Sequence, residues 1–392
     1  MNVKEVRKDF PILNQEKPPL YFDSACQSLR PKQVIDKINE YYNEYPACGG
    51  RSMHAFGKRV DEEVANARKI VQKFFNAKKS SEIIFTRNTT EGINLVVYSW
   101  PWKKGDVVVI SDKEHNSNLI PWQLLKNKGV ELKMYPFGNM EELKKTVEGA
   151  TALATSPLSN ADGSTQPAQE LCKIAHDAGA WVLLDAAQAA PHQELDVKRL
   201  SVDFLVCSGH KMLGPSGTGI LYGKEELLEK LAPFMTGGET VKESRYNSCV
   251  FEDLPHCFEA GLQNYAGIAG LGVAIKYLEK LGLSNISKHE AELTRHVAKA
   301  FETEPLSKAK MLGTAGSPIV SFVPQVLDVH HVALMLQETA NIMVRSGMHC
   351  NHSWFFANNM PGSVRLSCGP YNTKEECDVF IDAVKKIFST LA

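Results

Sequence analysis

The chain has 392 residues, of which 43% are hydrophobic and 23% charged, as is ordinary for a globular protein with a large core and room for two domains. Its 44 Lys and Arg residues balance 45 Asp and Glu residues, so no basic excess indicates nucleic-acid binding. No apolar stretch is long enough to span a membrane, and the first residues lack the apolar segment of a secretion signal, so we expect neither.

Strand and helix signals alternate through the first 222 residues. Apolar periodicity predicts helices at 1–14, 31–42, 60–75, from 93 onward, 140–147 and 167–178. Short runs rich in Val, Leu, Ile and Phe predict strands at 20–23, 82–86, 107–110, 130–135, 150–154, 181–184, 202–206 and 219–222. This order predicts a doubly wound, mostly parallel α/β sheet, whose last strand we expect to run antiparallel.

The remaining 170 residues predict a smaller α+β domain. Residues 236–258 have few periodic apolar positions and are expected to form a long functional loop or a disordered segment. Beyond them we expect helices at 266–281, 285–302, 329–340 and 374–391, and strands at 319–323, 342–344 and 363–367. We therefore expect a large domain at 15–260 and a small domain formed by 1–14 and 261–392.

Polar side chains follow two neighbouring strands of the predicted sheet. Asp185 and Gln188 follow the strand at 181–184, and Ser208, His210 and Lys211 follow the strand at 202–206. Because ligands of open α/β sheets bind outside the carboxyl ends of the strands, these side chains should converge on one crevice. A solvated lysine and a strand-end aspartate are each common alone, but the combination favours a functional site.

This combination suits pyridoxal 5'-phosphate. Lys211 can hold the cofactor as a Schiff base, while Asp185 pairs with the protonated pyridine nitrogen and keeps the ring electron-deficient. A ring in that state accepts electrons from a carbanion at the Cα of a substrate.

Three other strand ends carry further candidate site residues. Thr89 and Thr90 lie at the expected start of a helix, whose free N–H groups and positive dipole end suit a phosphate; simple N-capping is the alternative. His115 follows the strand at 107–110, where it can lie over a cofactor ring or be an ordinary loop histidine. Asn160 lies in a Ser-, Asp- and Gly-rich turn after the strand at 150–154.

Two segments of the small domain carry reactive or basic groups. Cys350 follows the strand and glycine-bearing loop that begin at Arg345, and it could be a mobile nucleophile whose thiolate His349 or Arg345 stabilises. The alternative is an inert buried thiol. Arg365 lies in an alternating strand, where its fork can bind a substrate carboxylate or form a surface ion pair.

The nine cysteines are scattered, odd in number and without a CxxC pair. We therefore expect no disulfide framework and no metal site, and a reducing cytoplasmic location.

Taken together, the chain resembles the class V aminotransferase family of fold type I pyridoxal phosphate enzymes, and within it the group II, SUF-type cysteine desulfurases. The resemblance covers nearly the whole chain, and the motif RSGMHC (345–350) points to desulfurases rather than transaminases. The motifs are TRNTTEGIN (86–94), the His115 loop, Ser159-Asn160, Asp185-Ala-Ala-Gln188, Ser208-Gly-His-Lys211, FEAGLQN (258–264), RSGMHC (345–350) and SVRLSCGPYNT (363–373).

The resemblance implies a role for each cofactor-site residue. Lys211 forms the covalent link to pyridoxal phosphate, Asp185 pairs with the pyridine nitrogen, and Gln188 bonds the phenolic oxygen. His115 stacks on the ring and can shuttle protons. The phosphate is bound by Thr89, Thr90, Ser208 and His210.

The resemblance also implies the substrate and its chemistry. Asn160 and Arg365 hold the carboxylate of L-cysteine, Arg345 lines the same pocket, and Cys350 attacks the substrate sulfur to become a persulfide while L-alanine forms. It further implies a homodimer, a sulfur-acceptor protein and a place in iron–sulfur cluster assembly. Leu262 departs from the family pattern, because a threonine there commonly reaches the phosphate of the neighbouring subunit.

Other functions fit the same fold. A selenocysteine lyase, an epimerase or a β-lyase shares these motifs, and selenocysteine turnover can survive the loss of Cys350 because selenide leaves readily. A non-catalytic scaffold that binds only a sulfur-transfer partner is the more distant alternative, and the intact Lys211 and Asp185 argue against it.

Overall fold

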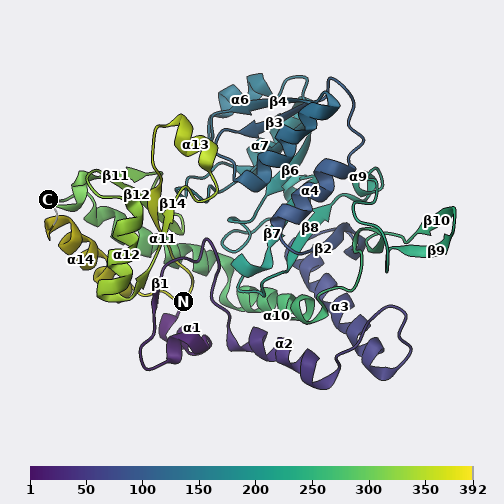
Figure 1. Cartoon of the computed structure of the whole chain (residues 1–392), viewed down its shortest axis with the longest axis horizontal. Helices are drawn as coiled ribbons and strands as arrows, with labels where there is room; N and C mark the ends of the chain where they lie inside the picture. The colour runs from purple at the N-terminus through teal and green to yellow at the C-terminus, as the bar shows by residue number, and fades with distance from the viewer. Residues whose placement is uncertain (391–392) are drawn as a thin grey trace.

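The computed structural model describes residues 1–390 and contains two main β-sheets (Figure 1). The larger sheet has seven strands in the order β2-β8-β7-β6-β5-β3-β4. Its strands are β2 (Ile83–Thr86), β3 (Val107–Ser111), β4 (Glu131–Tyr135), β5 (Ala152–Thr155), β6 (Trp181–Asp185), β7 (Phe204–Ser208) and β8 (Gly219–Gly223). The predicted mostly parallel sheet is confirmed: β3 to β7 run parallel, while β8 runs antiparallel to both β7 and β2, as expected.

Helices cover both faces of this sheet, which explains why its strands read as continuous apolar runs. In β6, Val182 and Leu184 pack into one core and Leu183 into the other, because successive side chains point to opposite faces. The first core includes side chains of α3 (Ala55–Phe74), α6 (Met140–Thr146), α7 (Ala168–Asp177), α8 (Val197–Leu200) and α10 (Tyr265–Leu281). The second includes side chains of α4 (Thr89–Ser99), α5 (Ile120–Leu124) and α9 (Glu225–Leu228).

The smaller sheet is antiparallel, with the strand order β11-β12-β15-β14. Its strands are β11 (Ala309–Leu312), β12 (Ile319–Pro324), β14 (Arg345–Gly347) and β15 (Ser363–Ser367). Phe322, Val364 and Phe380 belong to its separate apolar core, which is predicted by the alternation in β15. The helices of this part are α11 (Leu283–Ala300), α12 (Val329–Ala340), α13 (His352–Ala357) and α14 (Lys374–Thr390).

The N-terminal segment connects the two parts. β1 (Leu20–Tyr21) pairs in parallel with β13 (Ile342–Met343), beside the small sheet. Helices α1 (Val3–Lys8) and α2 (Lys32–Glu44) precede and follow it, and α10 packs against α2 and α3. Gly272 permits that packing, because a Cβ there would lie 3.2 Å from the Cβ of Ala67. The division into domains at 15–260 and at 1–14 with 261–392 stays a prediction.

The structure corrects two expectations and adds elements that were not predicted. Residues 236–258 are not a structureless loop: β9 (Val241–Arg245) and β10 (Ser248–Phe251) form a hairpin that projects from the body (Figure 1). Helix α4 begins at Thr89 rather than Ile93, because Asn88 caps it by accepting the N–H of Glu91. β11 and α13 were not predicted. The final helix is described to Thr390, and residue 391 of its predicted range lies outside the described residues.

Within residues 1–390, none of the helices is both long and apolar enough to cross a membrane.

Candidate active site

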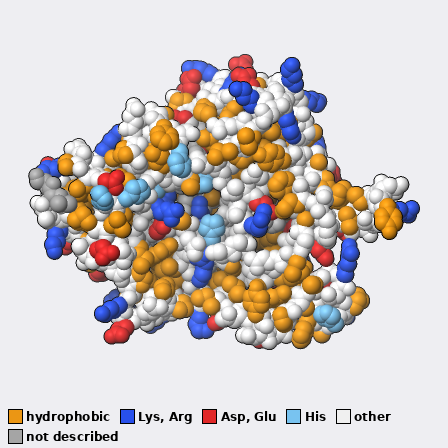
Figure 2. All heavy atoms as spheres, viewed as in Figure 1, with side chains coloured by type: hydrophobic (Ala, Val, Ile, Leu, Met, Phe, Trp, Pro, Cys, Tyr) orange, Lys and Arg blue, Asp and Glu red, His pale blue; other side chains and the backbone are white. Residues whose placement is uncertain are grey.

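A cavity of about 230 Å³ lies where the carboxyl ends of the parallel strands meet the small sheet. Figure 2 shows basic and histidine side chains gathered near the middle of this face of the molecule, between the two parts. All twelve residues singled out from the sequence line the cavity, so the structure brings every one of them together. They are Thr89, Thr90, His115, Asn160, Asp185, Gln188, Ser208, His210, Lys211, Arg345, Cys350 and Arg365.

Asp185 and Lys211 form the acid–amine pair of the cavity. Asp185 is the last residue of β6 and is 5% exposed; burial raises its pKa to about 6, although the Ala187 N–H and Lys211 oppose that rise. Lys211 ends the short 3-10 helix Gly209–Lys211 that follows β7. Burial lowers its pKa, against the attraction of Asp185. A lysine in this setting is readily deprotonated, which a nucleophilic or basic amine requires.

His115 is held as a neutral imidazole. Burial, followed by the nearby charges of Lys211 and Arg365, lowers its pKa to about 3. Its Nδ1 accepts the backbone N–H of Ser117 at 3.0 Å, which leaves the proton on Nε2. The imidazole is therefore suited to stack on a neutral or cationic ring without adding a charge of its own.

Hydroxyl groups converge at the start of α4. The hydroxyl of Ser208 accepts the N–H of Thr89 at 2.9 Å and lies 2.7 Å from the hydroxyl of Thr89, and the hydroxyl of Thr90 lies 2.7 Å from that of Ser117. Gly219 lets β8 pass close to this turn, since a Cβ there would lie 2.6 Å from the Cα of Asn88. Hydroxyls at a helix N-terminus match the donors that bind phosphate.

His210 and Gln188 complete the lining of this region. Burial, with Lys211 and Arg30 nearby, lowers the pKa of His210 to about 4, so this imidazole is also neutral. Gln188 donates its Nε2 to the carbonyl of Ala25 at 2.8 Å and so ties the loop after β6 to the turn at 23–28.

The opposite end of the cavity is basic. Arg365, at the centre of β15, is 3% exposed; its Nη1 donates to the carbonyl of Asn160 at 2.8 Å and its Nη2 to Asp23 at 3.2 Å. Its Nε has no hydrogen-bond partner among residues 1–390. Because a buried guanidinium N–H without a partner is costly, this atom marks a place for an acceptor such as a carboxylate.

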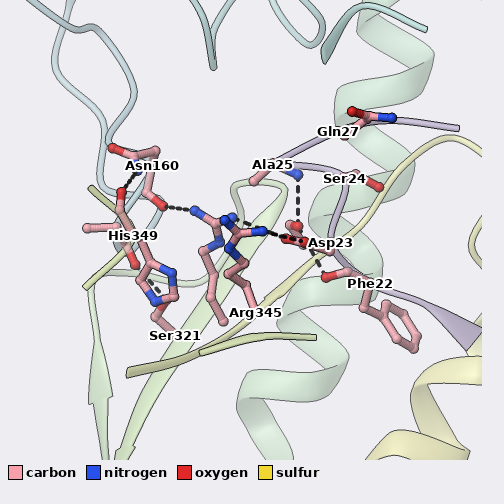
Figure 3. Close-up of polar contacts among 12 residues, drawn as sticks. Phe22, Asp23, Ser24, Ala25, Gln27, Asn160, Ser321, Arg345 and His349 are labelled. Atoms are coloured by element: carbon pink, nitrogen blue, oxygen red, sulfur yellow. Dashed lines mark hydrogen bonds and ion pairs between the residues drawn. The ribbon is translucent and has the colours of Figure 1, made fainter. Parts of the chain in front are cut away.

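Asp23 is a site residue that the sequence reasoning did not identify. Its carboxylate also accepts from Arg345 at 3.5 Å, so one acid contacts both guanidinium groups (Figure 3). The sequence signal for it is limited to the short strand expected at 20–23, which ends in this charged residue; no local signal identifies the partner of that strand, about 320 residues away.

The loop carrying Cys350 is anchored rather than free. His349 and Cys350 both have positive φ values, of 50° and 60°, a conformation that costs on the order of 1 kcal/mol for each residue. The carbonyl of His349 accepts from the Asn160 side chain and that of Cys350 from the N–H of Asn116, both at 2.7 Å. These bonds hold the strained turn in place and leave the Cys350 side chain exposed at the cavity.

The structure argues against one of the two residues that could stabilise a thiolate at Cys350. His349 is buried against Ser363, and burial, followed by Arg365 and Arg345, lowers its pKa to about 2. A neutral imidazole cannot stabilise a thiolate by charge. Arg345 is the remaining candidate of the two that the sequence suggested.

The residues present fit pyridoxal phosphate. The cavity offers a deprotonatable amine and a buried acid, a neutral imidazole between its ends, and a set of hydroxyl and N–H donors at a helix start. No group of His, Cys, Asp and Glu within residues 1–390 has the arrangement of a metal site. The nine cysteines are all free thiols in the structure.

Comparisons with known proteins give matches over nearly the whole chain. The family model for class-V aminotransferases matches residues 20–380. A probable cysteine desulfurase of Synechocystis is 40% identical over 398 residues, which cover 97% of this chain and 94% of that protein. One of Halalkalibacterium halodurans is 38% identical and covers 98% of each.

Solved structures are similar over the whole length. The apo structure of a cysteine desulfurase from Thermococcus onnurineus matches with a TM-score of 0.94 and 35% identity, covering 99% of this chain and 98% of the other. A cysteine desulfurase of Escherichia coli matches with a TM-score of 0.92 and 29% identity, covering all of both chains.

Proposed function

Because the chain belongs to the class-V aminotransferase family, we propose that it is a pyridoxal-phosphate-dependent cysteine desulfurase, which converts L-cysteine to L-alanine and places the sulfur on Cys350 as a persulfide. The observation that carries this proposal is one cavity lined by Lys211, Asp185 and Cys350. An amine, an acid and a thiol in that arrangement provide for covalent attachment of the cofactor, activation of the ring and capture of sulfur.

Residues of this cavity would hold the cofactor. Lys211 would bind its aldehyde, Asp185 would pair with its pyridine nitrogen, and the donors at the start of α4 would bind its phosphate. When bound, pyridoxal phosphate withdraws electrons from the Cα of an attached amine and so makes its proton acidic. A positive pyridine nitrogen beside Asp185 also offsets the burial that raises the pKa of this acid.

Lys211 moves the proton of the substrate. Its lowered pKa favours the neutral amine, which can accept the Cα proton. His115 stays neutral and its Nδ1 accepts the N–H of Ser117, so its Nε2–H can donate a hydrogen bond in the cavity but does not transfer a proton.

Arg365 binds the substrate carboxylate. Its Nε–H has no other partner and is free to donate a hydrogen bond to the carboxylate. Arg345 adds a second positive charge at the same end of the cavity. Asn160 contacts both Arg365 and the loop of Cys350, which supports a carboxylate site close to the thiol that must reach the substrate sulfur.

The Cys350 thiolate attacks the Sγ of the substrate. A new S–S bond forms, the Cβ–Sγ bond of the substrate breaks, and its electron pair goes to Cβ, which takes up a proton. Cα regains the proton that Lys211 accepted, which completes L-alanine. The anchored loop supports a short transfer path rather than a long swing, because its carbonyl groups are held by Asn116 and Asn160.

The proposed function also implies a partner subunit and a sulfur acceptor. We expect a homodimer, because the β9–β10 hairpin and the surface near it expose large apolar side chains: Met53, Phe56, Tyr246, Val250 and Leu262. Leu262 is 69% exposed and carries no hydroxyl, so it cannot supply the phosphate contact that the family pattern implies for a threonine at this position. A sulfur-acceptor protein, iron–sulfur cluster assembly and a cytoplasmic location follow from the same function.

The test is an assay of alanine and sulfide with L-cysteine, L-selenocysteine and L-cysteine sulfinate side by side. Wild-type holoenzyme is expected to form alanine from cysteine, whereas Cys350→Ala keeps the visible absorption of the bound cofactor and forms none. Full turnover of cysteine by Cys350→Ala would refute the nucleophile. Turnover of selenocysteine alone identifies a selenocysteine lyase, and a colourless protein after cofactor addition identifies a scaffold.

A further inference from the structure

A second cysteine lines the active-site cavity. Cys26 is partly exposed and, with Cys350, is one of two cysteines in the lining. Its turn is held from both sides of the cavity: Ala25 donates its N–H to the Ser367 hydroxyl at 2.9 Å, and its carbonyl accepts from Gln188 at 2.8 Å. The backbone next to Cys26 is therefore held in place at the site by hydrogen bonds.

The turn with Cys26 and the loop with Cys350 meet at the two arginines. Asp23, three residues before Cys26, accepts from both Arg345 and Arg365. On the other side Arg365 donates to the carbonyl of Asn160, whose side chain holds His349, the residue before Cys350. Figure 3 shows Arg345 between Asp23 on one side and Asn160 with His349 on the other.

The charges of the site act on both thiols. Burial tends to lower the pKa of Arg345, but Cys26, Asp23 and Cys350 together raise it above the ordinary value. The pKa of Lys211, lowered chiefly by burial, is likewise raised somewhat by both cysteines. Cys26 and Cys350 therefore both lie close enough to the same two cations, Arg345 and Lys211, to interact with them.

We propose that Cys26 is a second catalytic thiol, which discharges the persulfide of Cys350 as hydrosulfide and forms a Cys26–Cys350 disulfide. The inference rests on the proposed function, because the desulfurase reaction supplies the persulfide. It gives this chain an acceptor-independent route for releasing sulfur, in addition to transfer to another protein.

The step balances without an external oxidant. The Cys26 thiolate attacks the Sγ of Cys350, the bond from that Sγ to the terminal sulfur breaks, and the terminal sulfur leaves with the electron pair as HS⁻. The two cysteines lose two electrons and the transferred sulfur gains them. A small-molecule thiol or a dithiol protein then reduces the disulfide by exchange.

The acidity of the two possible leaving groups decides which sulfur of the persulfide is attacked. Attack on the terminal sulfur would expel the Cys350 thiolate, whereas attack on Sγ expels hydrosulfide. Hydrogen sulfide is a stronger acid than a cysteine thiol, and the thiolate of the stronger acid leaves faster. Formation of a disulfide is therefore favoured over passage of the persulfide to Cys26.

The test is a single turnover of the holoenzyme with less than one equivalent of L-cysteine, in the absence of other thiols. Alanine, free sulfide and the masses of the peptides carrying residues 26 and 350 are measured. Wild type is expected to release one sulfide for each alanine and to yield the two peptides joined by a disulfide. Wild type that forms alanine but keeps an added sulfur on Cys350 overturns the inference and leaves the proposed function intact.

Variants separate the two thiols. Cys26→Ser is expected to release about tenfold less sulfide for each alanine that it forms, and to retain the added sulfur on Cys350. Cys249→Ser removes an exposed thiol on β10 and is the matched control, expected to behave as wild type. Equal sulfide release by Cys26→Ser and wild type contradicts a role for Cys26.

A final arm does not depend on cofactor or turnover. Cofactor-free wild type treated with one equivalent of the thiol oxidant diamide is expected to yield the joined 26–350 peptides, and Cys26→Ser is expected to yield none. If the joined peptides do not form in wild type, the two thiols cannot meet and the proposal fails, whatever the enzyme's activity.

Discussion

Arg345 and Arg365 lie directly opposite each other in the antiparallel pair of β14 and β15. Like charges at such a position destabilise a sheet, and one of these two is almost fully buried. Asp23 resolves the conflict, because its two carboxylate oxygens each accept from one of the guanidinium groups. The parallel pairing of β1 with β13 brings Asp23 to this position from the far N-terminal end of the chain.

Replacing Asp23 with Asn is expected to destabilise the protein. The amide keeps the shape of the side chain but leaves two facing cations without a counter-charge, which costs about 2 kcal/mol in the free energy of unfolding. Urea titration of the cofactor-free protein measures this value. Glu243→Gln, which breaks an exposed ion pair with Arg245 on the β9–β10 hairpin, is the control and should change it by less than about 0.5 kcal/mol. Equal midpoints for the two variants would contradict the assigned role of Asp23.

Replacing Arg365 with Lys tests the carboxylate site. The charge stays, but the planar fork and the free Nε–H are lost, so the KM for L-cysteine is expected to rise about 10- to 100-fold. Cysteamine, which lacks the carboxylate, provides the control substrate. If Arg365 binds that group, the variant should discriminate between cysteine and cysteamine less than wild type does. Unchanged discrimination would place the carboxylate elsewhere.

Most of the large sheet could be predicted because its strands are buried on both faces. The runs at 181–184 and 202–206 are short and, apart from Asp203, apolar, and each is followed by polar residues that line the cavity. Strand ends of a parallel sheet share one edge, so Asp185, Lys211 and Asn160 could be brought together from the sequence order alone.

Features that depend on long-range register could not be predicted. Asp23 and Cys26 lie at the site because β1 pairs with β13 and Asp23 bridges to Ser367, each more than 300 residues away, and the short strand predicted at 20–23 does not reveal its partners. The β9–β10 hairpin was missed because its strands are exposed on both faces, so they lack the alternation that marks a half-buried strand. The anchored Cys350 turn depends on side-chain bonds from Asn160, which leave no local pattern.

Replacing Asn160 with Ala tests whether this residue positions the nucleophile. Its side-chain amide is already engaged by the carbonyl of His349, so its main effect should be on the Cys350 loop rather than on cysteine binding. Loss of this bond is expected to lower kcat for alanine formation about tenfold, with a smaller change in KM. The rate at which iodoacetamide alkylates Cys350 should change as well. A rise in KM alone would instead assign Asn160 to the substrate carboxylate.

Replacing Asp185 with Asn should raise the stability of the cofactor-free protein and lower the activity of the holoenzyme. In the cofactor-free protein, burial raises the pKa of Asp185 from 3.8 to about 6, so the folded state binds a proton more tightly than the unfolded state. The acid therefore destabilises the fold as pH rises from about 4 to 6, and the full penalty persists above that range. Asn carries no charge and can still accept the Ala187 N–H.

The cofactor-free Asp185→Asn protein is thus expected to be more stable than wild type by about 1–2 kcal/mol at pH 8, with the difference shrinking as pH falls from 6 to 4. Urea titrations across this pH range measure it, and Asp177→Asn, on the exposed side of α7, should show no such trend. The same substitution should lower kcat of the holoenzyme on the order of 10²-fold, because the pyridine nitrogen loses its counter-charge. A variant less stable than wild type at pH 8 would mean that Asp185 is stabilised by its surroundings even before the cofactor binds.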